Sequence, residues 1–444
     1  MTLPSISASS TSAARLPDWS SLSELGRMAA LEQCRRRLAH LGRVLHAVEH
    51  IYHAEPVREG PLAGLPYVAK DMFATGRSRP SWGCSAPQAP ALPRASVIDR
   101  LDLAGASLIG ASTMTELAYE PSGMARRRAL NPWRFDAIPG GSSTGSAILV
   151  AAGCCFAALG SDTGGSVRIP AHCCGITALK PGHGKIPLDG AMALAPSLDT
   201  FGIFARSAAD LALLWPVVSG DPVTNIENLP RAVLLRDAFE ASDAEIAGVC
   251  RGAVSVLAEG GMRIEETDGF SEEADLHALT VLLAEAAREH RARADDPAID
   301  AMLRKRISKG LVITDSELAA AIAARDALRD QFILCGLGED QVAVLPVMPI
   351  RTPVVSEVDP ASARFNPRVL YALSRFTRFV NYLGLPALAV PAGFDSTGMP
   401  VGLQLIGRPG SEGMLLQVAI GLQERTDWHG RVPTAVASDI AGEP

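Results

Sequence analysis

The sequence predicts one α/β domain in which a β-sheet carries helices on both faces. Three observations support this fold class. Short apolar segments bounded by turns alternate with segments of helical periodicity over the first half of the chain, which is typical of α/β sheets. The alternation resumes after Gln341, and no internal repeat divides the 444 residues. Hydrophobic residues make up 48% of the chain and charged residues 20%, a balance that supports one large core.

At the amino-terminal end, residues 1–20 are expected to form a disordered tail, because this stretch is rich in Ser and Ala and lacks the apolar segment of a signal peptide. A helix is expected over residues 22–53, where apolar residues recur at three- and four-residue spacing. His46, His50 and His53 would share one face of that helix. Metal ligation and packing of the rings against a neighbouring helix both remain open for these histidines.

Strands and helices are then expected to alternate. Gly105 is a helix stop between two of them, and Ser207 with Asp210 forms a capping box ahead of a later helix. The elements are a strand at 64–70 (GLPYVAK), a helix at 96–103, a strand at 107–111, a small-residue helix at 146–153, a buried strand at 154–160 and a helix at 210–218.

The second half of the chain contains two regions of different composition. Residues 221–335 are charged and helical, and we expect them to form solvated helices outside the sheet, with no function assigned. Between 340 and 410 the apolar segments QVAVLPVMP, LPALAVPAGF and VGLQLIG predict that the sheet resumes.

Composition and charge exclude several classes of protein. The formal net charge of −7 disfavours nucleic-acid binding, and no run of about 18 apolar residues predicts a membrane span. Eight cysteines without C-x-x-C spacing indicate buried reduced thiols in a cytoplasmic protein. Arg126, Arg127 and Arg128 form a solvated turn or an anion site. Cys173 and Cys174 beside His172 make a weak metal or thiol candidate, because adjacent residues rarely chelate one ion.

Two glycine-rich turns carry the strongest chemical signal. The first, PGGSSTGS, contains Ser142, and the second, DTGGSVR, contains Ser166. Between them, a helix rising about 15 Å and a strand spanning about 20 Å nearly cancel if they run antiparallel. Both serines then meet at one end of the sheet. Gly164 and Gly165 allow successive backbone N–H groups to point into one concavity, as an oxyanion hole requires.

Three other motifs overlap these turns without fitting them. Residues 140–146 resemble a phosphate loop that lacks the lysine needed to reach the phosphates. The G-x-S-x-G pattern at 141–145 matches a nucleophile elbow, but the elbow needs a preceding strand, which Pro132 and Pro139 prevent. His429 would be the histidine of a Ser-His-Asp triad, but no well-placed acid precedes it.

Several segments together resemble a known family. VAKDMF, TELAYEPSG, PGGSSTGSAILVAAG, GSDTGGSVRIPAHCCGITALKP and SLDTFGIFARSAADLALL are similar to the amidase signature family, densely over residues 60–220 and more loosely over 340–410. The resemblance implies one domain over residues 21–435 whose mixed, twisted sheet has about ten strands flanked by helices.

The resemblance also implies a Ser–cis-Ser–Lys triad, with Lys70 as base, Ser142 as relay and Ser166 as nucleophile. Thr144 stands where the family usually has glycine, and threonine is acceptable at a helix start. Further implied roles are an oxyanion hole from the backbone amides of Thr163, Gly164, Gly165 and Ser166, bracing of the turns by Ser143, Asp162 and Arg168, and a substrate pocket near Tyr119, Gly141, Met72 and Phe73.

The implied activity is hydrolysis of a small carboxamide through a seryl acyl-enzyme, without a metal ion or cofactor. An alternative with the same core is the glutaminase subunit of a tRNA-dependent amidotransferase, which works only in a complex. The intact Lys70, Ser142 and Ser166 disfavour a silent binding protein, and the resemblance suggests a homodimer. As a base, Lys70 must be neutral, which costs an ordinary lysine roughly 4 kcal/mol near neutral pH, and burial lowers that cost.

Overall fold

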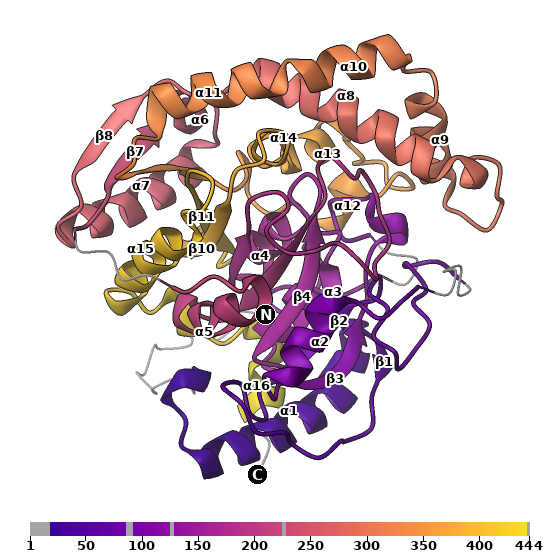
Figure 1. Cartoon of the computed structure of the whole chain (residues 1–444), viewed down its shortest axis with the longest axis vertical. Helices are drawn as coiled ribbons and strands as arrows, with labels where there is room; N and C mark the ends of the chain where they lie inside the picture. Colours follow the sequence, from indigo (N-terminus) through magenta and orange to yellow (C-terminus); the bar gives the residue numbers. More distant parts are fainter. Residues whose placement is uncertain (1–17, 86–91, 125–127, 224–227, 442–444) are drawn as a thin grey trace, which may run out of the picture.

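The structure, a computed structural model, describes residues 18–85, 92–124, 128–223 and 228–441 (Figure 1). These residues form an 11-stranded sheet in the order β1-β3-β2-β4-β6-β5-β10-β11-β9-β7-β8. The strands are β1 (Val48–Ile51), β2 (Pro66–Lys70), β3 (Ser107–Ser112), β4 (Ala157–Asp162), β5 (Thr177–Lys180), β6 (Thr200–Ala205), β7 (Arg231–Leu235), β8 (Ile264–Thr267), β9 (Gln341–Pro346), β10 (Ala387–Phe394) and β11 (Pro400–Ile406).

The sheet is mixed. Parallel pairing joins β3, β2 and β4 on one side and β9, β7 and β8 on the other, and the remaining neighbours pair antiparallel. The predicted α/β class and single domain are confirmed, with an 11-stranded sheet where about ten strands were expected. The strands expected at 64–70, 107–111 and after Gln341 are all present.

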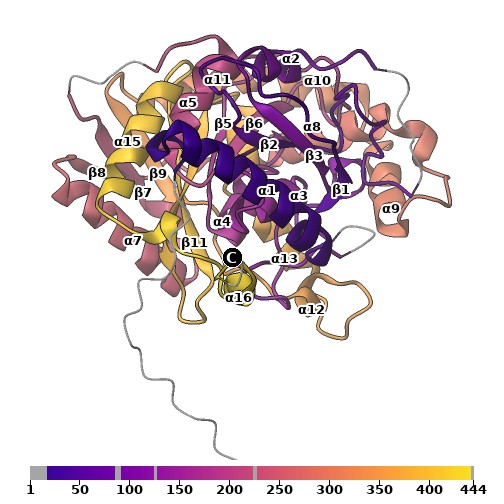
Figure 2. The same cartoon turned by 90° about the horizontal axis from the view of Figure 1, so that it is seen from below.

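Helices cover both faces of the sheet, as Figure 2 shows for α1, α3 and α5. The longer helices are α1 (Glu24–Val44), α2 (Ser96–Leu103), α3 (Thr144–Ala151), α4 (Arg168–Cys174), α5 (Ala208–Ser219), α7 (Ala244–Glu259), α8 (Glu272–Glu289), α9 (Ala301–Gly310), α10 (Asp315–Ala323), α11 (Arg325–Gly336), α13 (Pro367–Leu373) and α15 (Glu412–Glu424). Shorter ones are α6 (Arg236–Glu240), α12 (Val355–Val358), α14 (Arg378–Tyr382) and α16 (Ala437–Ala441), with 3-10 turns at Trp19–Ser21, Glu116–Ala118, Arg291–Arg293, Trp428–Gly430 and Thr434–Val436.

Two hydrophobic clusters lie on opposite faces of the sheet. Along β2, Tyr67 and Ala69 join one cluster and Val68 joins the other, as the two-residue period of a strand requires. The first cluster receives side chains from α2, α5, α7 and α15, and the second from α1, α3 and α4. Central strands buried on both faces explain why β2 and β4 are almost continuously apolar.

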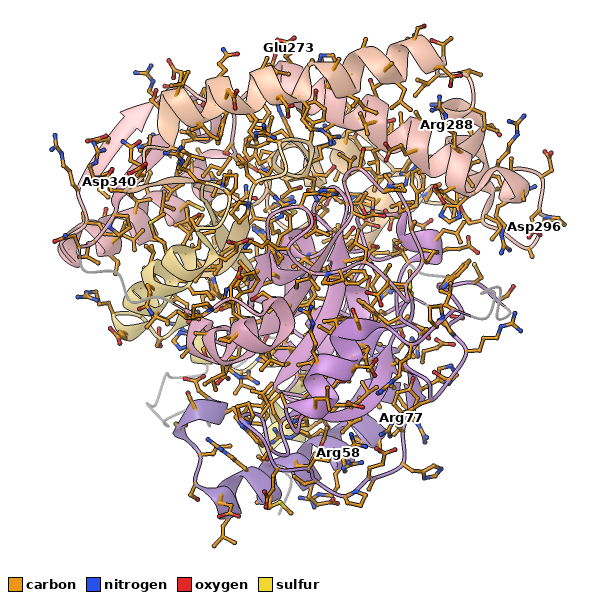
Figure 3. All side chains as sticks on the ribbon, viewed as in Figure 1. Arg58, Arg77, Glu273, Arg288, Asp296 and Asp340 are labelled. Carbon is orange, nitrogen blue, oxygen red and sulfur yellow. The ribbon has the colours of Figure 1, made fainter. Side chains whose placement is uncertain are left out.

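The expectation that residues 221–335 lie wholly outside the sheet is wrong. β7 and β8 come from this region and extend one edge of the sheet. α8 to α11 do form an outer layer, drawn in salmon and orange in Figure 1, and Figure 3 labels Glu273, Arg288 and Asp296 at its periphery. Periodicity missed β7 and β8 because both are short and flanked by strongly helical sequence.

The expected helix over residues 22–53 is also wrong in its second part. α1 ends at Val44, His46 adopts a positive φ of 53°, and His50 lies on β1. Pairing of β1 with β3 outweighs the helical pattern of residues 45–53, so the three histidines do not share a helix face. No group of three or more His, Cys, Asp or Glu side chains is arranged to hold a metal within the described residues.

Ordered structure begins before the expected end of the tail. Trp19 is fully buried, and its backbone N–H donates to the carboxylate of Asp210 at 3.2 Å. Ser207 caps α5 as expected, accepting from the Asp210 N–H at 3.1 Å, but the Asp210 carboxylate binds the amino-terminal turn instead of Ser207. Residues 1–17 lie outside the described part of the chain.

The arginine cluster, the cysteines and the absence of a predicted membrane span can each be compared with the structure. Arg126 and Arg127 lie outside the described residues, and the Arg128 guanidinium donates to the carbonyl oxygen of Phe135 at 2.7 Å. Of the eight cysteines, seven are buried and one, Cys335, is exposed, and no disulfide bond joins any of them in the described part of the chain. Over the described ranges, no helix is both long enough and apolar enough to cross a membrane.

Candidate active site

Two neighbouring parallel strands and two helix starts bring the candidate catalytic residues together. Lys70 is the last residue of β2, whereas Ser142 and Ser166 lie just before α3 and α4. β2 and β4 are parallel, so their carboxyl ends lie at the same edge of the sheet. The Ser143 N–H donates to the carbonyl oxygen of Ser166 at 3.2 Å, which holds the two serine turns side by side. The Gly141–Ser142 peptide bond is cis.

Lys70 is completely buried, and its amine has two hydroxyl partners. The Nζ atom lies 2.7 Å from Ser142 Oγ and 2.8 Å from Ser161 Oγ. Burial lowers the pKa of Lys70 to about 7, although the carboxylates of Asp199 and Asp162 oppose that shift. A large share of the amine is therefore neutral near pH 7. The cost of roughly 4 kcal/mol for an ordinary lysine falls below about 1 kcal/mol.

Asp71, the sequence neighbour of Lys70, makes its hydrogen bonds elsewhere. Its carboxylate accepts from the Ser81 N–H at 2.8 Å and from the Ser81 hydroxyl at 2.5 Å. Burial raises the pKa of Asp71 to about 6, and the hydrogen bonds from Ser81 oppose that rise. Successive side chains of an extended chain point to opposite sides, which explains how a lysine and an aspartate can be adjacent without pairing.

Ser166 is 9% exposed and lines a cavity, beside backbone amides that are free to donate. Within the described residues, the N–H groups of Thr163, Gly164 and Ser166 have no acceptor. The Gly165 N–H instead donates to Asp162 Oδ1 at 2.7 Å. The expectation of four oxyanion donors is therefore wrong for Gly165, whose φ of 129° turns its amide toward that carboxylate.

Asp162 and Arg168 form a buried pair beneath the second turn. The guanidinium donates to both carboxylate oxygens, at 2.9 and 3.0 Å, and to Gln404 Oε1 at 2.6 Å and Asn381 Oδ1. Burial alone would raise the pKa of Asp162, but the Arg168 charge outweighs it and the pKa falls to about 2. The carboxylate also accepts from the N–H groups of the turn, so this pair fixes the backbone around Ser166.

Replacing Arg168 with methionine is expected to destabilise the protein by about 3–5 kcal/mol, because it leaves the Asp162 charge buried and unpaired. Urea unfolding followed by circular dichroism measures this loss. Arg288→Met is the matched control, since Arg288 pairs with an exposed Asp315 at the periphery (Figure 3) and its loss costs below about 1 kcal/mol. Equal losses in the two variants would contradict the bracing role.

Asp199 is a site residue that sequence reasoning missed. Its carboxylate accepts from the Thr163 hydroxyl at 2.6 Å and from the N–H groups of Leu194 and Ala195 at 2.8 and 3.1 Å. Burial raises the pKa of Asp199 to about 6, and the three hydrogen bonds oppose that rise. Asp199 lies inside the SLDTFGIF segment, but nothing in that pattern indicates that β6 pairs with β4 and places it beside Thr163.

Asp199→Asn is expected to lower kcat by about ten- to a hundredfold and to change KM little, because Thr163 loses its charged acceptor. The Asp199 carboxylate raises the pKa of Lys70, so its removal should move the acidic limb of the pH–rate profile to lower pH. Asp71→Asn, another buried carboxylate, should leave that limb in place. A limb that moves equally in both variants would count against the specific role of Asp199.

The cavity at Ser166 has a volume of about 260 Å³, near the lower end of small-molecule sites, which measure roughly 300–1,000 Å³. Thr163, Gly164 and Ser166 form its floor, and the outer helices α8, α9 and α13 supply most of the wall. Helices given no function at the sequence level therefore shape the cavity.

Tyr119 lines the cavity, as expected. Its hydroxyl has no hydrogen-bond partner among the described residues, and burial raises its pKa far above the ordinary value. Leu117 and Ala118, just before it, have positive φ values of 50° and 59°. Non-glycine residues in the left-handed region cluster at functional sites, where the surrounding structure imposes the strain. This backbone places the Tyr119 ring at the cavity wall.

Met72, Phe73 and Gly141 do not line the cavity at Ser166. Met72 and Phe73 are buried in the first hydrophobic cluster at the end of β2, where the chain turns and both N–H groups donate to the carbonyl oxygen of Lys70. Gly141 donates its N–H to the carbonyl oxygen of Pro121 at 2.7 Å, and a Cβ there would lie 2.7 Å from the carbonyl oxygen of Glu120. Close backbone approach therefore explains the glycine.

The alternatives at His172 and the nucleophile elbow are not supported. Burial lowers the pKa of His172 to about 3, and its Nδ1 accepts from the Gly402 N–H at 3.0 Å. Burial also raises the pKa of Cys173 to about 12, which keeps it as a thiol. No strand lies within residues 128–143, immediately before and including Ser143, so the strand that a nucleophile elbow requires is absent there. α3 begins at Thr144, as expected.

Comparison with known proteins gives consistent results. The amidase family profile matches residues 43–416. A glutamyl-tRNA(Gln) amidotransferase subunit from Halorhodospira halophila is 35% identical over 422 residues, covering 84% of this chain and 86% of that protein. The corresponding subunit from a Marinomonas species is 31% identical, covering 88% and 89%.

Two solved structures are similar over most of their length. The crystal structure of an amidase has a TM-score of 0.81 at 30% identity, covering 90% of this chain and 96% of that one. The crystal structure of the glutamyl-tRNA(Gln) amidotransferase subunit from Thermotoga maritima has a TM-score of 0.77 at 25% identity, covering 93% and 95%. The profile, the relatives and the fold agree: this chain belongs to the amidase signature family and is an amidase-type enzyme that acts on carbon–nitrogen bonds.

Proposed function

We propose that the protein is a serine amidohydrolase that cleaves a small carboxamide through an acyl-enzyme on Ser166. The observation that carries this proposal is the buried amine of Lys70, 2.7 Å from Ser142 Oγ, next to a serine in the cavity wall. A neutral amine in contact with a hydroxyl is a general base, and a neighbouring hydroxyl relays its effect to the nucleophile. No metal ion or cofactor is needed for these steps.

In the first step, neutral Lys70 accepts the proton of Ser142 while Ser142 accepts the proton of Ser166. The Ser166 oxygen then forms a bond to the carbonyl carbon of the substrate. A pKa near 7 supports this role, because the lysine is neutral often enough to accept a proton and basic enough to hold it.

The negative charge that develops on the carbonyl oxygen needs preorganised donors. The unpaired N–H groups of Thr163, Gly164 and Ser166 supply them, and each such donor is worth about 3 kcal/mol in related acyl-transfer reactions. Asp199, Asp162 and Arg168 hold these amides in place from below. The donors are therefore fixed before the substrate binds.

The intermediate collapses when the carbon–nitrogen bond breaks. Ser142 returns its proton to the leaving nitrogen and is reprotonated by Lys70, which leaves an ester on Ser166. A water molecule then adds to the ester carbon, and one of its protons passes through Ser142 to Lys70. The bond from the carbon to the Ser166 oxygen breaks as that oxygen regains this proton from Lys70 through Ser142. The product leaves as a carboxylic acid, which gives its remaining proton to the released ammonia or amine and becomes a carboxylate. The lysine alternates between neutral and charged forms.

A second candidate is the glutaminase subunit of a tRNA-dependent amidotransferase. The similar proteins from Halorhodospira halophila and a Marinomonas species favour it, because both are amidotransferase subunits and both match more than four-fifths of this chain. The chemistry at Ser166 would be the same in both candidates. They differ in the amide that is cleaved and in whether other subunits must be present.

The deciding experiment uses the purified chain alone. Ammonia release is measured from glutamine and from a panel of aliphatic and aryl amides, and hydroxylamine is added to convert an acyl-enzyme to a hydroxamate. Turnover of one non-glutamine amide with hydroxamate formation would support the stand-alone hydrolase. No ammonia release from any amide, followed by glutaminase activity when the other amidotransferase components are added, would support the second candidate instead.

A further inference from the structure

The cavity beside Ser166 has two chemically different walls. One part of the wall is apolar. It is built from Leu279, Leu282 and Leu283 of α8, Met302 of α9, Leu370 of α13, and the ring of Tyr119. A substrate body that fills this part must be apolar, because it loses its contact with water there.

The positively charged part of the wall lies on α9. Lys305 and Lys309 are one helical turn apart, so they share a face of α9, and Arg306 lies beside them. None of the three has a carboxylate within 4.0 Å in the described ranges. Arg378, the fourth cation of the cavity, differs because it pairs with Asp275 at 2.6 Å. The cationic side chains of the cavity that lack a carboxylate partner are therefore all on α9.

The positive charge of Arg306 is partly balanced by neighbouring groups, whereas the charges of the two lysines are not. Its guanidinium stands 5.9 Å from the centre of the Tyr119 ring, and it also borders an adjoining cavity whose wall includes Glu116 and Glu120. Attraction to Arg306 opposes the burial-driven rise in the pKa of Glu120. Lys305 and Lys309 line the cavity that contains Ser166 and do not line the adjoining cavity.

No carboxylate lines the Ser166 cavity among the residues that the structure describes. An ammonium group on the substrate would therefore meet cations on α9 and no counter-ion. An anionic group would meet two unpaired lysines, which are exposed to solvent, in a cavity whose remaining wall is largely apolar. Free amino acid amides carry an ammonium group, so this wall disfavours them.

We propose that the substrate is a carboxamide with an apolar body and a carboxylate at its far end, which Lys305 and Lys309 bind. This inference rests on the proposed amidohydrolase function and specifies its substrate class. The amide carbonyl lies at Ser166 and the backbone amides of Thr163, Gly164 and Ser166. The body contacts the leucines of α8, and the carboxylate reaches α9.

The test compares three primary amides of equal length: octanamide, its ω-carboxylate analogue suberamate, and its ω-amino analogue. Primary amides release only ammonia, so the whole organic part of each substrate must occupy the cavity. The expected kcat/KM for suberamate is about tenfold above that for octanamide, and the ω-amino analogue is the poorest substrate. The preference for suberamate should shrink in high salt, because both lysines are exposed to solvent.

The double variant Lys305→Gln/Lys309→Gln should lose the roughly tenfold preference, measured as the ratio of kcat/KM for suberamate to kcat/KM for octanamide in the same variant. Arg304→Gln, on the same helix but outside the cavity wall, is the matched control and should keep the preference. Calorimetric binding of suberamate and octanamide to Ser166→Ala gives the same comparison without turnover.

The outcomes separate the two proposals. Equal or better use of octanamide or the ω-amino analogue, or equal binding of suberamate and octanamide, would overturn the substrate inference alone. An unchanged preference in the double lysine variant would overturn it as well. Octanamide turnover that persists in Ser166→Ala would overturn the proposed function.

Discussion

Replacing Ser166 with alanine is expected to lower kcat by about 10,000-fold or more, because the variant has no oxygen to attack the carbonyl carbon. Lys70 and Ser142 remain in place, yet without the nucleophile they have no proton to move toward the substrate. Residual turnover would come from the preorganised amides alone. Steady-state ammonia release measures the loss, and intact-protein mass spectrometry should detect an acyl adduct only in the wild type.

Ser374→Ala is the matched control for this prediction. Ser374 also lines the cavity, but its hydroxyl accepts a hydrogen bond from Arg378 at 2.8 Å and is not linked to Lys70. We expect its kcat to stay within about tenfold of the wild type, the range of lost non-catalytic hydrogen bonds. If Ser166→Ala retained wild-type kcat, the nucleophile would have to be another residue.

Replacing Lys70 with methionine is expected to lower kcat by about a thousandfold or more at pH 7.5, because methionine has no basic nitrogen. In the wild type, kcat/KM should fall as pH drops below about 7, where Lys70 becomes protonated. The sign follows from the role: the neutral amine is the active form, and the group is protonated below its pKa. The variant should show no such acidic limb.

Lys180→Met is the control for a buried lysine that lies outside the catalytic site. Burial lowers the pKa of Lys180 to about 7 as well, but its amine donates to the carbonyl oxygen of Pro181 at 2.7 Å. The acidic limb should survive in this variant, provided thermal unfolding shows that it is folded. A limb near pH 7 that persists in Lys70→Met would assign that titration to another buried group.

Local sequence carries much of the fold. The strand ending at Lys70, the helix at 96–103, the start of α3 at Thr144 and the cap at Ser207 all depend on neighbours a few residues away, and all appear in the structure. The helix over 22–53 failed after Val44, and β7 and β8 went unnoticed. In those places a distant strand partner, which periodicity does not contain, decided the conformation.

The same division applies to the site. The order of Lys70, Ser142 and Ser166 and the glycines of the second turn are visible in the sequence. Backbone geometry decides that the Gly165 N–H donates to Asp162. Asn381 and Gln404, which accept hydrogen bonds from Arg168, lie more than 200 residues away from it in the sequence. Hydrogen bonds of that range depend on which strands are neighbours in the sheet.

The family, the α/β class and the residues able to perform acyl transfer can be read from the sequence, because they depend on residue type and short spacing. The burial that lowers the pKa of Lys70 to about 7 and the hydrogen bond from Thr163 to Asp199 arise only in the folded chain. The enclosure of the serine by α8 and α9 arises only there as well. Burial and electrostatic environment are sums over neighbours from the whole chain, so they exist only once the chain has packed.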